Sequence, residues 1–189
     1  MLDLLHEQLE AADVYYKDVI AKSNGQYKES RIDLAVDGMT KAEFLAWWKD
    51  WMIALSNPET KQKTFLDTMV PAHPEHYAPP PYPAGIIETI GEHVARVRIQ
   101  PSMDLPEFVK AHSDPSYQPL SAIGTLDDGS ILFYIFQEVR EARERGCDFR
   151  LRLLFPAAAP QVFFDEHAEH LAVEFRSFLA TAAMHQSEA

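Results

Sequence analysis

The sequence predicts an α+β protein in which an antiparallel sheet packs against a long C-terminal helix. Apolar residues recur every three or four positions near both ends of the chain, and they alternate with polar residues in the segments between. With 189 residues the chain is long enough for one domain with a sizeable core, and we expect only one. The expected layout of residues 1–189 is an N-terminal helical segment 1–57, a proline-rich loop 70–84, a sheet 86–155 and a C-terminal helix 164–184.

Two helices are predicted before the sheet. Residues 2–22 have apolar side chains at helical spacing, and Asn24-Gly25 ends that segment. Residues 26–39 are ambiguous, because their apolar side chains alternate over Ile32–Val36 as in a short strand. The second helix begins at the capping box Thr40-Lys-Ala-Glu43 and ends near Asn57. Its aromatic face indicates core packing or, alternatively, one wall of an aromatic ligand pocket; it includes Trp47, Trp48 and Trp51.

The segment 70–84 is rich in proline, so we expect neither a helix nor an inner strand there. We interpret it as a rigid loop that lies over the domain. After it the apolar period changes from three or four residues to two. The predicted strands are 86–91, 93–100, 119–126, 130–139 and 148–155.

Two further patterns complete the predicted architecture. Ile131–Phe136 is apolar on both faces and should therefore be central in the sheet, after a hairpin turn at Asp127-Asp128-Gly129. Residues 164–184 form one amphipathic helix with an apolar stripe that should cover the sheet. A curved sheet that grips a C-terminal helix is the helix-grip architecture, which is START-like or Bet v1-like, and a cavity lies between sheet and helix in that arrangement.

Composition narrows the function classes. The formal net charge of −12 argues against a nucleic-acid partner or an anionic membrane surface, because a phosphate backbone would be repelled. A single cysteine, Cys147, excludes an intramolecular disulfide and a cysteine-rich zinc module, and we expect it to be structural. No apolar run is long enough for a membrane span, and the first residues do not resemble a signal peptide. We therefore expect a soluble, cytoplasmic protein, and a homo-oligomer is compatible with the sequence.

The C-terminal helix carries a group of candidate metal ligands. At 100° per residue, His167, His170 and Glu174 fall within an arc of about 60° beside the apolar stripe. Two imidazoles and a carboxylate match the ligand types of a zinc site. The alternative is a half-exposed polar flank without a function.

A second group lies in and after the proline-rich loop. His73 and His76 are held in a chain restricted by proline, as a rigid ligand requires, although both could equally be solvent-facing. Glu88 lies among isoleucines, and if it shares their inward face it needs a partner or a metal. Four arginines should form the solvated face of the sheet or, alternatively, bind a substrate carboxylate; they are Arg96, Arg98, Arg150 and Arg152.

These features together resemble the diacetylphloroglucinol hydrolase and phloretin hydrolase family. The resemblance covers residues 38–180 and is carried by short motifs in the same order. They are Trp47-Trp48, His73-Pro-Glu-His76-Tyr77, Glu88-Thr-Ile-Gly91 and His170-Leu-Ala-Val-Glu174. That family has a START-like fold and a zinc ion held by two histidines and two glutamates.

The resemblance implies a zinc-dependent hydrolase that cleaves the carbon–carbon bond between an acyl group and a phenolic ring, on an aromatic or polyketide-like ketone. It places Zn²⁺ on His76, Glu88, His170 and Glu174, although His73 competes with His76 for the loop ligand. Candidates for the acid that protonates the leaving ring are the unligated loop histidine, with His73 expected in that role, Tyr77 and His167. Aromatic side chains that would line the ring pocket are Trp47, Trp51, Phe133 and Phe164. The alternative function is a metal-free helix-grip module that binds a small apolar ligand.

Overall fold

The computed structural model describes residues 2–77 and 86–187. Its helices are α1 (Leu2–Lys22), α2 (Lys41–Ser56), α3 (Lys61–Thr64), the π-helix η1 (Phe65–Met69), α4 (Val70–Ala72), α5 (Glu107–Lys110) and α6 (Gln161–Ser187). Its strands are β1 (Tyr27–Asp37), β2 (Ile86–Ile90), β3 (His93–Pro101), β4 (Gln118–Thr125), β5 (Ile131–Glu141) and β6 (Gly146–Pro156).

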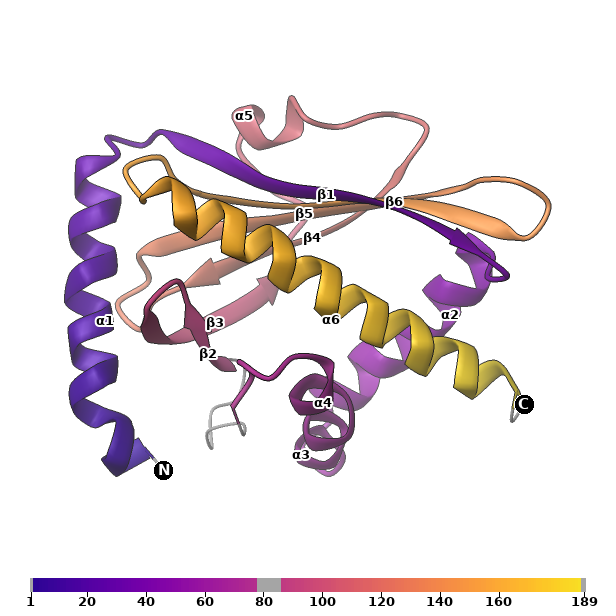
Figure 1. Ribbon diagram of the computed structural model, residues 1–189, viewed down its shortest axis with the longest axis horizontal. Helices are drawn as coiled ribbons and strands as arrows, with labels where there is room; N and C mark the ends of the chain where they lie inside the picture. The colour runs from indigo at the N-terminus through magenta and orange to yellow at the C-terminus, as the bar shows by residue number, and fades with distance from the viewer. Residues whose placement is uncertain (1, 78–85, 188–189) are drawn as a thin grey trace.

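The strands form one antiparallel sheet in the order β1-β6-β5-β4-β3-β2. The sheet curls into a half-barrel, and α6 runs diagonally across one of its faces (Figure 1). This confirms the predicted α+β class and is compatible with a helix-grip arrangement. The strand around Ile131–Phe136 is inside the sheet, as its two apolar faces predict.

The apolar stripe of α6 is the centre of the main core. Leu171, Phe175 and Phe178 are buried there against residues of β5 and β6. In α2, Trp47 and Trp51 are also buried, and their rings pack against Phe178. The aromatic face of α2 is therefore core packing. The capping box at its start is present, with Thr40 and Glu43 bonded reciprocally.

Two segments differ from the sequence-based prediction in secondary structure. The ambiguous segment after the first helix is an eleven-residue edge strand, β1, that pairs with β6 along its whole length. Helical structure also continues through 61–72, so the first residues of the predicted loop 70–84 are helical. Pro71 lies at the start of α4, directly after η1, in the last turn of this helical run. Residues 78–84 of that loop lie outside the described part of the chain.

The predicted solvated arginine face is wrong for Arg152. The segment that contains α5 lies on the face of the sheet opposite α6 (Figure 1) and forms a second, smaller core there. Beneath it Arg152 is buried and pairs with the buried carboxylate of Glu138, with Nη1 2.8 Å from Oε2. Sequence alternation assigned Arg152 to the correct face, but not to a covered part of it.

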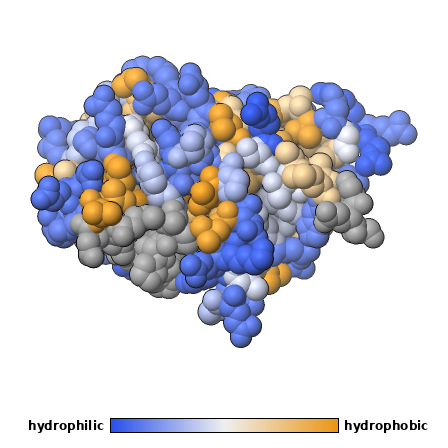
Figure 2. All heavy atoms as spheres, turned by 60° about the horizontal axis from the view of Figure 1, so that its bottom comes forward, coloured by the Kyte–Doolittle hydropathy of each residue, from blue (hydrophilic) through white to orange (hydrophobic). Residues whose placement is uncertain are grey.

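Two surface properties can be stated for the described residues. None of their helices has the length and apolar character needed to cross a bilayer. Figure 2 turns the lower part of Figure 1 towards the viewer and shows a largely hydrophilic face, on which hydrophobic residues form separate patches.

Cys147 is buried, and burial raises the pKa of its thiol to about 11, in line with a structural role.

Candidate metal centre

The segment around His76 is held at the edge of the sheet by β2. Backbone hydrogen bonds of 2.9 and 3.2 Å join residues 75–77 to residues 87–89, and they place His76 directly opposite Glu88. Side chains directly opposite each other in an antiparallel pair lie on the same face, with Cβ atoms about 4.5–5.5 Å apart. The convergence of His76 and Glu88 is therefore a consequence of strand register.

The ring of His76 is oriented by the helical segment that precedes it. Its Nδ1 lies 2.7 Å from the carbonyl oxygen of Met69, the last residue of η1. Helical structure ends at Ala72, so this carbonyl belongs to the last turn, where backbone oxygens have no partner within the helix. His76 Nδ1–H donates to it, and Nε2 is consequently turned towards Glu88.

Helix α6 brings the other two candidate ligands to the same place. His170 Nε2 lies 3.2 Å from His76 Nε2. His76 Nε2 also lies 3.5 Å from Glu88 Oε2 and 3.7 Å from Glu174 Oε1. His76, Glu88 and His170 are buried and offer ligand atoms within 4.8 Å of one another, and Glu174 is largely buried beside them. The structure thus brings His76, Glu88 and His170 together as a group that could hold a metal ion, and it places Glu174 next to His76.

The electrostatics of this cluster call for a cation at its centre. His170 Nδ1 faces Glu75 and His76 Nδ1 faces the Met69 carbonyl, so both remote nitrogens are next to acceptors. When both carry their hydrogen there, two lone pairs point at each other across 3.2 Å, between two carboxylates. A proton or a metal ion between them removes this repulsion.

The pKa values of the buried groups reflect this requirement. Burial by itself lowers the pKa of His76, but its hydrogen bond to Glu88 and the charges of Glu174 and Glu88 outweigh burial and raise that pKa to about 9. Burial raises the pKa of Glu174 to about 7. Burial, together with the neighbouring imidazoles, lowers the pKa of His170. A positive charge on His76 therefore balances the carboxylates of Glu88 and Glu174, as a bound metal ion would.

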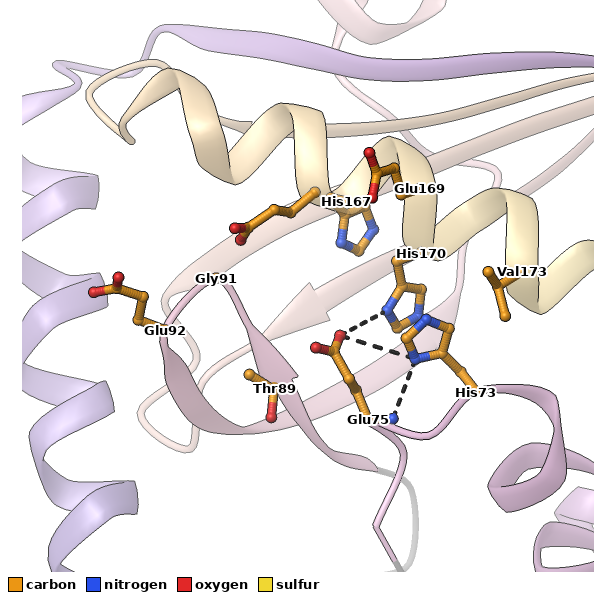
Figure 3. Close-up of a pocket in the computed structure, with 10 residues that line it drawn as sticks. His73, Glu75, Thr89, Gly91, Glu92, His167, Glu169, His170 and Val173 are labelled. Carbon is orange, nitrogen blue, oxygen red and sulfur yellow. Dashed lines mark hydrogen bonds and ion pairs between the residues drawn. The ribbon is translucent and has the colours of Figure 1, made fainter.

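His170 also belongs to a second group, with His73 and Glu75. In Figure 3 these three side chains point towards one another, with Glu75 Oε2 3.5 Å from His170 Nδ1 and 3.8 Å from His73 Nδ1. The backbone N–H of Glu75 donates to His73 Nδ1 at 3.2 Å, so the lone pair that a metal would need is already used. Of the two competing loop histidines, only His76 lies beside both Glu88 and Glu174.

A cavity of about 390 Å³ opens next to the cluster. Of the four candidate ligands, only His170 is among the described residues that line it. The described residues that line it are His73, Glu75, Thr89, Gly91, Glu92, Glu166, His167, Glu169, His170 and Val173. The four aromatic residues expected to line a ring pocket are buried in the main core and are not among the described residues that line this cavity.

The three candidate catalytic residues lie at or beside this cavity. His73 lines it and stacks on His170, with ring centroids 3.9 Å apart. His167 also lines it, and its buried Nε2 has no hydrogen-bond partner among the described residues. Burial lowers the pKa of His167 to about 4. Tyr77 is half-buried, and its hydroxyl lies 2.9 Å from the hydroxyl of Thr89 in the cavity wall.

Sequence reasoning missed Glu75, which faces both His73 and His170. The only signal available was its place between the two loop histidines, and a carboxylate in such a loop is usually solvent-exposed.

Comparison of the chain with protein-family models and with curated proteins finds no match. These comparisons do not test the resemblance to the diacetylphloroglucinol hydrolase and phloretin hydrolase family, which stays a sequence-based prediction.

Proposed function

We propose that this protein is a zinc-dependent hydrolase that cleaves the carbon–carbon bond between an acyl group and an aromatic ring in a phenolic or polyketide-like ketone. One observation supports the metal-dependent part: His76 Nε2 and His170 Nε2 face each other at 3.2 Å between Glu88 and Glu174. Two imidazole nitrogens and two carboxylates are ligand types that zinc binds. The substrate class is carried by the resemblance.

The residues around the cluster suit the proposed chemistry. Hydrolysis adds the hydroxyl group of water to the acyl carbon and a proton to the ring carbon that leaves. A bound Zn²⁺ supplies a Lewis acid that lowers the pKa of a water molecule to about 7 and polarises a carbonyl group. His76, Glu88, His170 and Glu174 are the residues that would hold the ion.

Different roles follow for the three candidate catalytic residues. The backbone bond to His73 Nδ1 leaves the proton of its neutral ring on Nε2, which makes His73 a hydrogen donor beside His170. Burial keeps His167 uncharged at neutral pH, so we assign it to substrate binding rather than to protonation of the ring. Tyr77 and His73 remain the two candidates for the proton donor.

The residue types at the cavity give the alternative of a module for an apolar ligand less support than the metal-dependent proposal. Four glutamates and three histidines contribute to it, whereas pockets for apolar ligands are lined mainly by hydrophobic and aromatic side chains. Trp47, Trp51, Phe133 and Phe164 are buried in the main core.

Metal analysis tests the proposal most directly. The purified protein should hold about one zinc per chain, His170→Ala should hold none, and His167→Ala should keep it, because His167 stacks on His170 but is not one of the residues that would hold the ion. The wild type should then be incubated with an acylated trihydroxybenzene, with release of the free ring followed by chromatography. A wild type that takes up no zinc would overturn the proposal, and zinc binding without ring release would overturn the substrate class.

A further inference from the structure

We propose that Glu75 is a positioning residue for the metal centre, whose carboxylate holds the His170 imidazole so that Nε2 points at the bound ion. This inference rests on the metal-dependent part of the proposed function. Metal-binding histidines generally donate their other ring N–H to a carboxylate or a carbonyl, which fixes the tautomer and the ring orientation.

The contact that carries the proposal is the one between Glu75 Oε2 and His170 Nδ1, at 3.5 Å (Figure 3). Both backbone polar groups of Glu75 are hydrogen-bonded. Its carbonyl oxygen accepts from the backbone N–H of Thr89 at 3.2 Å, and its own N–H donates to His73 Nδ1 at 3.2 Å. The carboxylate therefore projects from a backbone that is attached to the sheet.

Both imidazoles of the cluster have their Nδ1 next to an acceptor and their Nε2 facing the cluster. His76 donates from Nδ1 to the Met69 carbonyl, and His170 faces Glu75 with its Nδ1. In each ring the remote nitrogen is engaged and Nε2 is left to face the cluster. Without Glu75, the His170 proton would be free to occupy Nε2, where it would block a metal.

Glu75 fits this indirect role better than a place among the ligands. Its side chain is 45% exposed, whereas those of Glu88 and Glu174 are 7% and 14% exposed. In the nearby His73, the Nδ1 lone pair already accepts a hydrogen bond from a backbone N–H. That nitrogen therefore cannot serve as the third metal ligand of a group formed by His73, Glu75 and His170.

The cavity offers a matched control. Glu92 also lines the cavity, and in Figure 3 it points away from His170, so Glu92→Ala removes one negative charge from the cavity wall without touching the ring. Glu75→Ala removes charge and acceptor together. Glu75→Gln removes the charge but keeps an oxygen that can accept from His170 Nδ1–H.

The experiment measures zinc affinity by competition with a chelator, and the visible absorption spectrum of the Co²⁺-substituted protein, for the wild type and these three variants. We expect Glu75→Ala to weaken zinc binding by about 10–100-fold and to change the Co²⁺ spectrum. Glu75→Gln should regain most of the affinity and the wild-type spectrum, and Glu92→Ala should remain close to the wild type. Melting temperatures of the metal-free proteins, measured in parallel, should differ little, because Glu75 is half-exposed.

Three outcomes would overturn the inference. Glu75→Ala with wild-type affinity and spectrum would show that His170 needs no support from Glu75. Equal losses in Glu75→Ala, Glu75→Gln and Glu92→Ala would assign the effect to charge alone. A wild type that binds neither zinc nor Co²⁺ would remove the metal centre and the proposed function as well, whereas the first two outcomes leave the proposed function standing.

Discussion

Helix α6 carries both a candidate metal ligand and the centre of the core, so two substitutions in it should have separable effects. Phe175 is fully buried, and its ring lies 5.9 Å from that of Phe149 and 6.3 Å from that of Trp48. Phe175→Ala should lower the free energy of unfolding by about 3–5 kcal/mol, because it leaves a cavity in a closed core. For a chain of this length that corresponds to a fall in melting temperature of about 6–20 °C.

His170→Ala should behave differently, because His170 borders an existing cavity that water can enter. Its main effect should be on the response to zinc. An ion present at 100 times its Kd stabilises the folded state by about 2.7 kcal/mol, which for this chain is a rise in melting temperature of about 5–11 °C. We expect this rise in the wild type and in Phe175→Ala, and none in His170→Ala.

Scanning calorimetry of the three proteins, each with a chelator and with zinc, measures both effects. A zinc-dependent rise in His170→Ala equal to that of the wild type would refute the assignment of His170 as a ligand. If the metal-free His170→Ala melted as early as metal-free Phe175→Ala, His170 would be a packing residue, and the reasoning from its place beside the cavity would be wrong.

Three other predictions follow from particular contacts. Because the pKa of His76 is about 9, zinc must displace a proton from this ring at neutral pH, and zinc affinity should increase as the pH rises towards 9. Calorimetric titrations with zinc at several pH values check this, and an affinity that does not change with pH would contradict it. Arg152→Met should cost about 3–5 kcal/mol in urea unfolding, because it leaves the Glu138 carboxylate buried without its cation. The double variant Arg152→Met/Glu138→Leu should regain most of that loss, and equal stability of the single and double variants would argue against the pair. Gly124→Ala would place a Cβ 2.2 Å from the Phe133 ring and should cost about 1–3 kcal/mol in the same assay, whereas wild-type stability would show that the ring moves aside freely.

The parts of the structure that depend on neighbours in sequence were predictable. The capping box at Thr40 and the apolar stripe of α6 are properties of single segments, and each is found where the sequence places it. The same holds for His170 and Glu174, because residues four apart share a helical face. Strand alternation also placed Arg152 correctly on the face opposite α6, although the cover formed by the α5 segment could not be seen in β6 itself.

The sequence by itself therefore determined the α+β class, the central strand and the α6 half of the candidate metal centre. Only the tertiary structure decided the loop half. His76 lies in the cluster because its segment pairs with β2 and its Nδ1 meets the Met69 carbonyl, while His73 is held by a different bond. Glu75 belongs to the site because it contacts His170, which lies 95 positions further along the chain. Helical spacing fixes which side chains share a face of one segment, but the meeting of loop, strand and helix depends on how the whole sheet closes around α6.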